Sequence, residues 1–113
     1  MVEISIGGLM ATGYRLASAA EKDLIEILDY TTREWGISQA EKYAAEIEGC
    51  LLAIVRSPEH AKPFFVEGIK IFIWRCKCHY IFYLERGEFV DVLAILHTSR
   101  DLVMHLNDRL GDC

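Results

Sequence analysis

The chain has 113 residues, enough for one hydrophobic core but not for two, so we expect a single domain. Hydrophobic residues make up 52% of it, which excludes a disordered chain, and no apolar run approaches the roughly 20 residues that cross a bilayer. The formal net charge of -5 argues against a protein that holds nucleic acid by general electrostatics, because phosphate contacts require clustered lysine and arginine. Because residues 1–13 also lack the pattern of a signal peptide, we expect a globular cytoplasmic protein.

Residues 1–13 contain three glycines and a second methionine, Met10. Two interpretations of this segment remain open: an N-terminal extension, or a start assigned too early. The single domain is therefore expected to cover residues 14–113, beginning with a short strand at Tyr14–Ala17.

A first helix is expected after this strand. Ser18 and Glu21 have the spacing of a capping box, in which the serine hydroxyl and the glutamate carboxylate satisfy backbone amides at a helix start. Gly36 can supply the left-handed conformation that ends a helix. Between them, apolar residues recur on one helical face, at Leu24, Ile27, Leu28, Thr31 and Trp35.

A second helix is expected almost at once. Ser38 and Glu41 repeat the capping-box spacing, and Ser57-Pro58 ends the helical pattern. Two helices joined by so short a connection must run antiparallel as a hairpin. The apolar stripe of this helix consists of Ala40, Tyr43, Ala44, Ile47, Leu51 and Ile54.

Three strands and a closing helix are expected in the rest of the chain. The strands are predicted at Ile69–Arg75, Lys77–Leu84 and Phe89–Leu96, with a hairpin turn at Glu85–Glu88. The order β-α-α-β-β-β-α predicts an α+β fold in which the helical hairpin packs on a small antiparallel sheet. The closing helix is indicated by leucines four residues apart, at Leu102, Leu106 and Leu110.

The four cysteines do not have the spacing of a zinc site. Cys76 and Cys78 fall in a strand-like segment, where both side chains would point to the same face. Cys50 falls on a helix and Cys113 is the last residue. We therefore expect reduced, mostly structural thiols, and neither a metal ion nor another cofactor.

His97 ends the last predicted strand, where a side chain can reach a partner. A Ser-His-Asp triad is excluded, because neighbours within one turn cannot form the line that orients the base. Thr98 or Ser99 is better interpreted as a helix N-cap. Lys70, Arg75 and Lys77, with Arg86 and Arg100, could hold a phosphate backbone or an acidic protein segment. Ordinary charges at a sheet edge explain these residues equally well.

In its order of motifs the chain resembles the ParE/RelE superfamily of small toxins from bacterial toxin–antitoxin pairs, and within it the ParE branch. The resemblance covers about Tyr14 to Leu110. It is carried by Tyr14-Arg15-Leu16, Ala20-x-x-Asp23-Leu24, Tyr30, Trp35-Gly36, Gln39-Ala40-x-x-Tyr43, Pro58, Gly68, His79-Tyr80-Ile81-Phe82-Tyr83, Ile95-Leu96-His97 and Arg100-Asp101.

The resemblance implies a non-enzymatic toxin that inhibits DNA gyrase by protein binding and is neutralised by a cognate antitoxin. Toxin and antitoxin would then form a hetero-oligomer. We expect the partner-binding surface to include Lys70, Phe72, Trp74, Arg75, Lys77, His97 and Arg100.

Two alternatives accompany this expectation. A RelE-like, ribosome-dependent mRNA endonuclease would use Arg75 and Arg100 to stabilise charge and His97 as acid or base. A non-toxic relative would only bind the antitoxin. The acidic net charge and the lack of a basic second helix make the endonuclease less favoured than the gyrase inhibitor.

Overall fold

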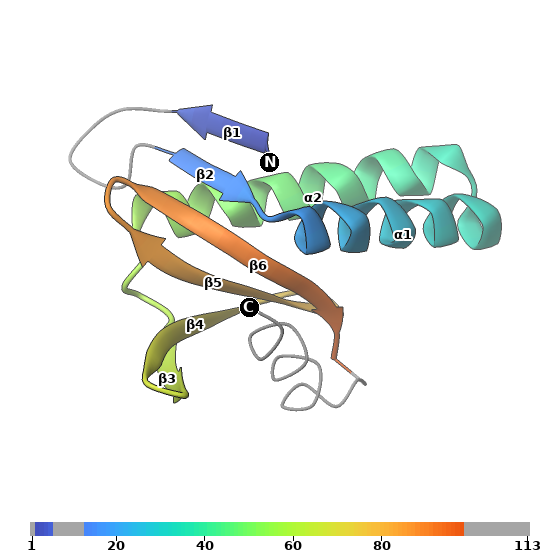
Figure 1. The fold of residues 1–113 in the computed structure, drawn as a ribbon. Coiled ribbons are helices and arrows are strands. Elements are labelled where there is room, and N and C mark those ends of the chain that lie inside the picture. The colour runs from blue at the N-terminus through green and yellow to red at the C-terminus, as the bar shows by residue number, and fades with distance from the viewer. Residues whose placement is uncertain (1, 6–12, 99–113) are drawn as a thin grey trace.

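The computed structural model describes residues 2–5 and 13–98, which form two helices and a six-stranded sheet (Figure 1). The elements are β1 (Val2–Ser5), β2 (Gly13–Leu16), α1 (Ser18–Trp35), α2 (Ile37–Arg56), β3 (Lys62–Val66), β4 (Ile69–Cys76), β5 (His79–Arg86) and β6 (Phe89–His97). The α+β class and the predicted run of β-α-α-β-β-β are confirmed, while β1 and β3 were not predicted. The predicted closing helix lies outside the described residues.

A single residue, Gly36, connects the two helices. Its φ of 94° is the positive value that a glycine adopts without strain. Its N–H donates to the Thr32 carbonyl at 3.0 Å, and its own carbonyl accepts from the Ala40 N–H at 3.1 Å. The predicted antiparallel hairpin is confirmed, with Gly36 at its tip. Within the described residues, neither helix is long and apolar enough to cross a membrane.

Both predicted capping boxes are wrong. Ser18 is already the first residue of α1, and the Glu21 N–H bonds to the Ala17 carbonyl at 2.9 Å rather than to a serine hydroxyl. α2 begins at Ile37, one residue before Ser38, and no side-chain cap is present at either helix start. The backbone carbonyls that precede each helix provide the first hydrogen bonds.

The sheet has the order β1-β2-β6-β5-β4-β3. Strands β4, β5 and β6 form the predicted antiparallel meander, because two-residue turns join them. Strand β2 pairs with β6 in parallel, so the sheet is mixed rather than wholly antiparallel. The direction of this pair could not be inferred from a turn, because β2 and β6 are far apart in the sequence.

The helices cover one face of the sheet (Figure 1). The alternation of side chains along the strands creates two clusters, one on each face. Phe72 and Tyr83 stack on the helix-facing side with ring centroids 5.3 Å apart. Ile71 and Phe82 are fully buried on the opposite side. The central strand β6 contributes buried residues to both clusters, as predicted for a strand covered on both faces.

A β-bulge interrupts β6. Phe82 pairs with Ala94 but Tyr83 pairs with Val92, so β6 has one extra residue, Leu93, between these two pairs. One extra residue reverses the alternation of the rest of the strand. Ile95 and His97 therefore lie on the helix-facing side, where regular alternation from Val90 and Val92 would have placed Ala94 and Leu96.

Strand β2 covers only the first half of the β6 edge, from Phe89 to Val92. Helix α1 covers the remainder of this edge. The Ala17 N–H donates to the Val92 carbonyl at 2.9 Å, and the Ile95 N–H donates to Asp23 Oδ2 at 2.9 Å. Asp23 is 9% exposed, so its carboxylate replaces water as the partner of a buried backbone amide.

Removing the Asp23 carboxylate should therefore destabilise the fold. We expect Asp23→Ala to lower the free energy of unfolding by about 1–3 kcal/mol, because a buried N–H loses its acceptor. Asp23→Asn should cost less, since an amide oxygen can still accept the hydrogen bond. Urea denaturation at pH 7 measures both. Glu26→Ala, an exposed carboxylate on the same helix, is the matched control and should stay within about 0.5 kcal/mol of the wild type.

Candidate functional site

A groove of about 960 Å³ lies between the helical hairpin and one end of the sheet. Its walls come from α1, α2, the β4–β5 turn and the adjoining ends of β5 and β6. Figure 1 shows the hairpin and the β5–β6 pair diverging toward this end. Two large side chains of α1 stay uncovered along it, with Trp35 72% and Tyr30 55% exposed. The groove therefore combines aromatic surface with polar groups from the strand ends.

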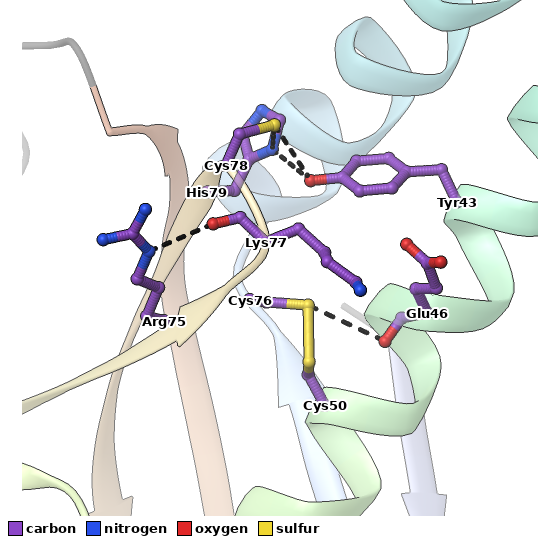
Figure 2. The surroundings of a disulfide bond; sticks show 8 residues. All are labelled: Tyr43, Glu46, Cys50, Arg75, Cys76, Lys77, Cys78 and His79. Carbon is purple, nitrogen blue, oxygen red and sulfur yellow. Dashed lines mark hydrogen bonds between the residues drawn. A yellow bond between two sulfur atoms is a disulfide. The ribbon is translucent and has the colours of Figure 1, made fainter.

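Three polar side chains meet on the wall of the groove (Figure 2). The Tyr43 hydroxyl lies 2.5 Å from His79 Nδ1 and 3.5 Å from Cys78 Sγ. Cys78 Sγ lies 3.4 Å from the same His79 nitrogen, so the three groups form a closed triangle of hydrogen-bonding contacts. We call these residues the Tyr43–Cys78–His79 cluster.

A second histidine adjoins this cluster. His97 is paired with His79 across the β5–β6 ladder, and their rings meet edge to face with centroids 5.2 Å apart. His79 is only 8% exposed, whereas His97 is exposed at the end of β6. The β-bulge at Leu93 is what brings His97 to this side of the sheet.

Burial raises the pKa of the Tyr43 hydroxyl above its usual value near 10, and its hydrogen bond to Cys78 raises the pKa further. Tyr43 therefore keeps its proton at neutral pH. A protonated hydroxyl can donate one hydrogen bond and still accept another, so it can serve both His79 and Cys78.

A disulfide joins Cys50 on α2 to Cys76 at the end of β4, with the two Cα atoms 6.2 Å apart (Figure 2). The prediction of reduced thiols is therefore wrong for these two residues. Cys76 and Cys78 both point toward α2, as expected, but Cys78 does not belong to a strand. Cys76 is the last residue of β4, while Cys78 lies in the turn and is exposed. Pairing residues 26 positions apart depends on how the helix packs on the sheet, which spacing alone does not reveal.

The groove brings together only part of the predicted binding surface. Lys77 and His97 line it. Lys70 and Arg75 lie elsewhere and on opposite faces of β4, with Lys70 Nζ 5.3 Å from the Phe72 ring and the Arg75 guanidinium 5.9 Å from the Tyr80 ring. Arg100 lies outside the described residues.

The two predicted aromatic contacts belong to the core. Phe72 is 2% exposed beneath the helices, so the structure removes it from the predicted surface. Trp74 is half-buried at the edge of the same cluster, with its ring centroid 6.3 Å from that of His60. In place of Phe72 and Trp74, the exposed aromatic surface of the groove comes from Trp35 and Tyr30.

Sequence reasoning did not single out Tyr43, Cys78 or His79 as functional candidates. Lys77 and Cys78 were predicted in a strand, but they form a two-residue turn that places Cys78 and His79 at the end of a hairpin. Within residues 2–5 and 13–98, no group of three or more histidine, cysteine or acidic side chains is placed to hold a metal ion.

Comparison with known proteins identifies relatives of the chain. A family model described as the ParE toxin of the type II toxin–antitoxin system parDE matches residues 14–102. Toxin ParE from Escherichia coli is 39% identical over 100 residues, covering 88% of this chain and 97% of the relative. Toxin ParE1 from Caulobacter vibrioides is 33% identical over 95 residues, covering 82% of this chain and 96% of the relative.

A solved structure shares the fold. The chromosomal ParDE TA system from P. aeruginosa contains a chain that superposes with a TM-score of 0.61 at 18% identity. The match covers 73% of this chain and 90% of that one.

The raised pKa of Tyr43 predicts a loss of stability in alkali. An unfolded tyrosine ionises near pH 10 while the folded Tyr43 stays protonated, so the free energy of unfolding should fall as the pH rises above about 10. Tyr43→Phe should flatten this decline by less than about 1.4 kcal/mol per pH unit, because the ring is partly exposed.

Urea denaturation between pH 7 and pH 11 measures this effect. Tyr30→Phe removes one exposed hydroxyl and is the matched control. Tyr83, whose pKa burial also raises, should account for part of the remaining decline. If the free energy of unfolding of Tyr43→Phe falls with pH as steeply as that of the wild type, burial does not hold the proton on Tyr43.

Proposed function

The chain belongs to the ParE toxin family of type II toxin–antitoxin systems, and we propose that it inhibits DNA gyrase by binding the enzyme and is neutralised by a cognate antitoxin. The observation that carries this proposal is the match to ParE toxins over nearly their whole length, 97% in the Escherichia coli relative. Membership of such a system implies an antitoxin partner. We place the interaction in the cytoplasm, where gyrase acts.

The groove supports a mechanism by binding rather than by catalysis. It combines exposed aromatic side chains with charged groups at its rim, the composition that protein interfaces favour. We therefore propose that the gyrase-binding surface includes Lys77 and His97 of the groove. Lys70 and Arg75 are exposed elsewhere on the sheet and would each contact a partner separately.

The arrangement of Arg75 and His97 argues against the endonuclease alternative. A nuclease must gather its charge-stabilising and proton-transferring groups around one phosphate. Arg75 contacts Tyr80 on the face of the sheet away from the helices, whereas His97 contacts His79 on the helix-facing side. The described members of the predicted catalytic set thus lie on opposite sides of the sheet.

A supercoiling assay with purified gyrase tests the proposal. The protein should inhibit supercoiling in proportion to its concentration, and adding the antitoxin should restore it. Because the cytoplasm reduces most disulfides, the assay should be run with and without reductant. If correctly folded protein does not inhibit gyrase and its expression does not slow growth, the chain is a non-toxic relative. If translation stops first and mRNA is cut, it is an endonuclease.

Substitutions in the groove should weaken inhibition. We expect Lys77→Glu or His97→Ala to raise the half-inhibitory concentration about tenfold, the effect of losing one significant interface contact. Ile25→Ala, at a 68% exposed residue of α1 outside the groove, is the control and should inhibit like the wild type. If all three variants inhibit gyrase equally, the gyrase-binding surface lies outside the groove.

A further inference from the structure

We propose that Cys78 is a reactive thiol that forms a mixed disulfide with low-molecular-weight disulfides entering the groove, with His79 as the general base. This inference does not depend on gyrase inhibition. It rests on three observations together: an exposed thiol, a base and a hydroxyl in contact with it, and a cavity onto which the thiol opens.

The contact between Cys78 and His79 supplies the base. Reactive cysteines need a base within hydrogen-bonding reach, and a third group that orients the base. Cys78 Sγ lies 3.4 Å from His79 Nδ1, within reach of a sulfur hydrogen bond. His79 is held by its burial, by Tyr43 and by the ring of His97, so its imidazole faces the sulfur in a fixed position.

Tyr43 acts as a positioning residue for this pair. Its hydroxyl contacts both His79 Nδ1 and Cys78 Sγ, and its raised pKa keeps the hydroxyl protonated. When the thiol proton moves to His79, the Tyr43 O–H can donate to the sulfur anion. The hydroxyl thus stabilises the charge that forms on Cys78.

The cysteines of the described chain differ in access. Cys50 and Cys76 are joined to each other, and Cys76 is 2% exposed. Cys78 is the free cysteine of this part of the chain and is exposed. Among the described cysteines, Cys78 is therefore the thiol with which a small disulfide from solvent can react.

The groove offers room for a small disulfide and mixed charge around the thiol. Its volume of about 960 Å³ lies in the range of small-molecule sites. α1 contributes the carboxylates of Asp23 and Glu26, and α2 contributes Glu46. A cation comes from the other side, where Lys77 precedes Cys78 and its side chain extends toward Glu46 (Figure 2). β6 adds His97 beside His79.

The reaction is a thiol–disulfide exchange. His79 Nδ1 accepts the proton of Cys78, and the sulfur anion attacks one sulfur of the incoming disulfide. A new S–S bond to Cys78 forms as the S–S bond of the small molecule breaks. The leaving thiolate takes the proton from His79. One thiol and one disulfide therefore give one mixed disulfide and one free small thiol, with no other oxidant.

The rate of reaction with oxidised glutathione tests the proposal. The protein is used without reductant and with Cys113→Ser, so that Cys78 is the only free thiol. Intact-mass spectrometry follows the adduct at pH 7. The reference is a synthetic peptide of residues 74–82 with serine in place of Cys76. We expect Cys78 in the protein to react about tenfold faster than the peptide.

Two variants separate a chemical role from a structural one. His79→Gln and Tyr43→Phe should each slow the reaction several-fold at pH 7. Both deficits should disappear near pH 9.5, because an ordinary thiol then ionises without a base. Circular dichroism checks the fold, and Tyr43→Phe keeps the test valid if His79→Gln does not fold. A rate equal to that of the peptide, unaffected variants, or deficits that persist at pH 9.5 would each overturn the proposal.

Discussion

The unequal length of two neighbouring strands is the constraint on which the rest of the structure depends. β6 has nine residues, but β2 has four and pairs only with its first half. The remaining edge of β6 would leave backbone amides buried without partners. α1 meets this need through Asp23, which accepts the Ile95 N–H. This bond fixes the first turns of α1 against the strand. The far half of the hairpin lies beyond it, and the groove opens there.

A single inserted residue then decides what the groove contains. The register of the β5–β6 pair shifts by one residue at Leu93, so the alternation of β6 reverses after Val92. His97 consequently faces the helices and meets His79, while Leu96 joins the opposite cluster. Without the bulge, an aliphatic side chain would stand beside His79. The polar character of this wall is thus a product of strand register as much as of residue type.

Much of the fold was predictable from the sequence, because the hairpin and the meander depend on local patterns. Helical spacing, Gly36 and the turn between β5 and β6 were sufficient for these elements, although the turn at Lys77 and Cys78 was predicted as strand. The site was less predictable. Lys70 and Arg75 are five positions apart in one strand, so their side chains point to opposite faces of the sheet. Predicting them as one binding surface ignored this alternation. The bulge at Leu93 and the Cys50–Cys76 pairing depend on tertiary packing and leave no local signal.

The disulfide beside the groove has a consequence for the lifetime of the chain. It closes a loop between residues 26 apart, which removes conformational freedom from the unfolded state worth about 3–4 kcal/mol in the chain-entropy description. This is a large share of the stability of an ordinary small domain. Proteases cut chains mainly when they open, so the oxidised protein should persist longer than the reduced one. The lifetime of the protein in a cell therefore depends on the thiol–disulfide redox state of its surroundings.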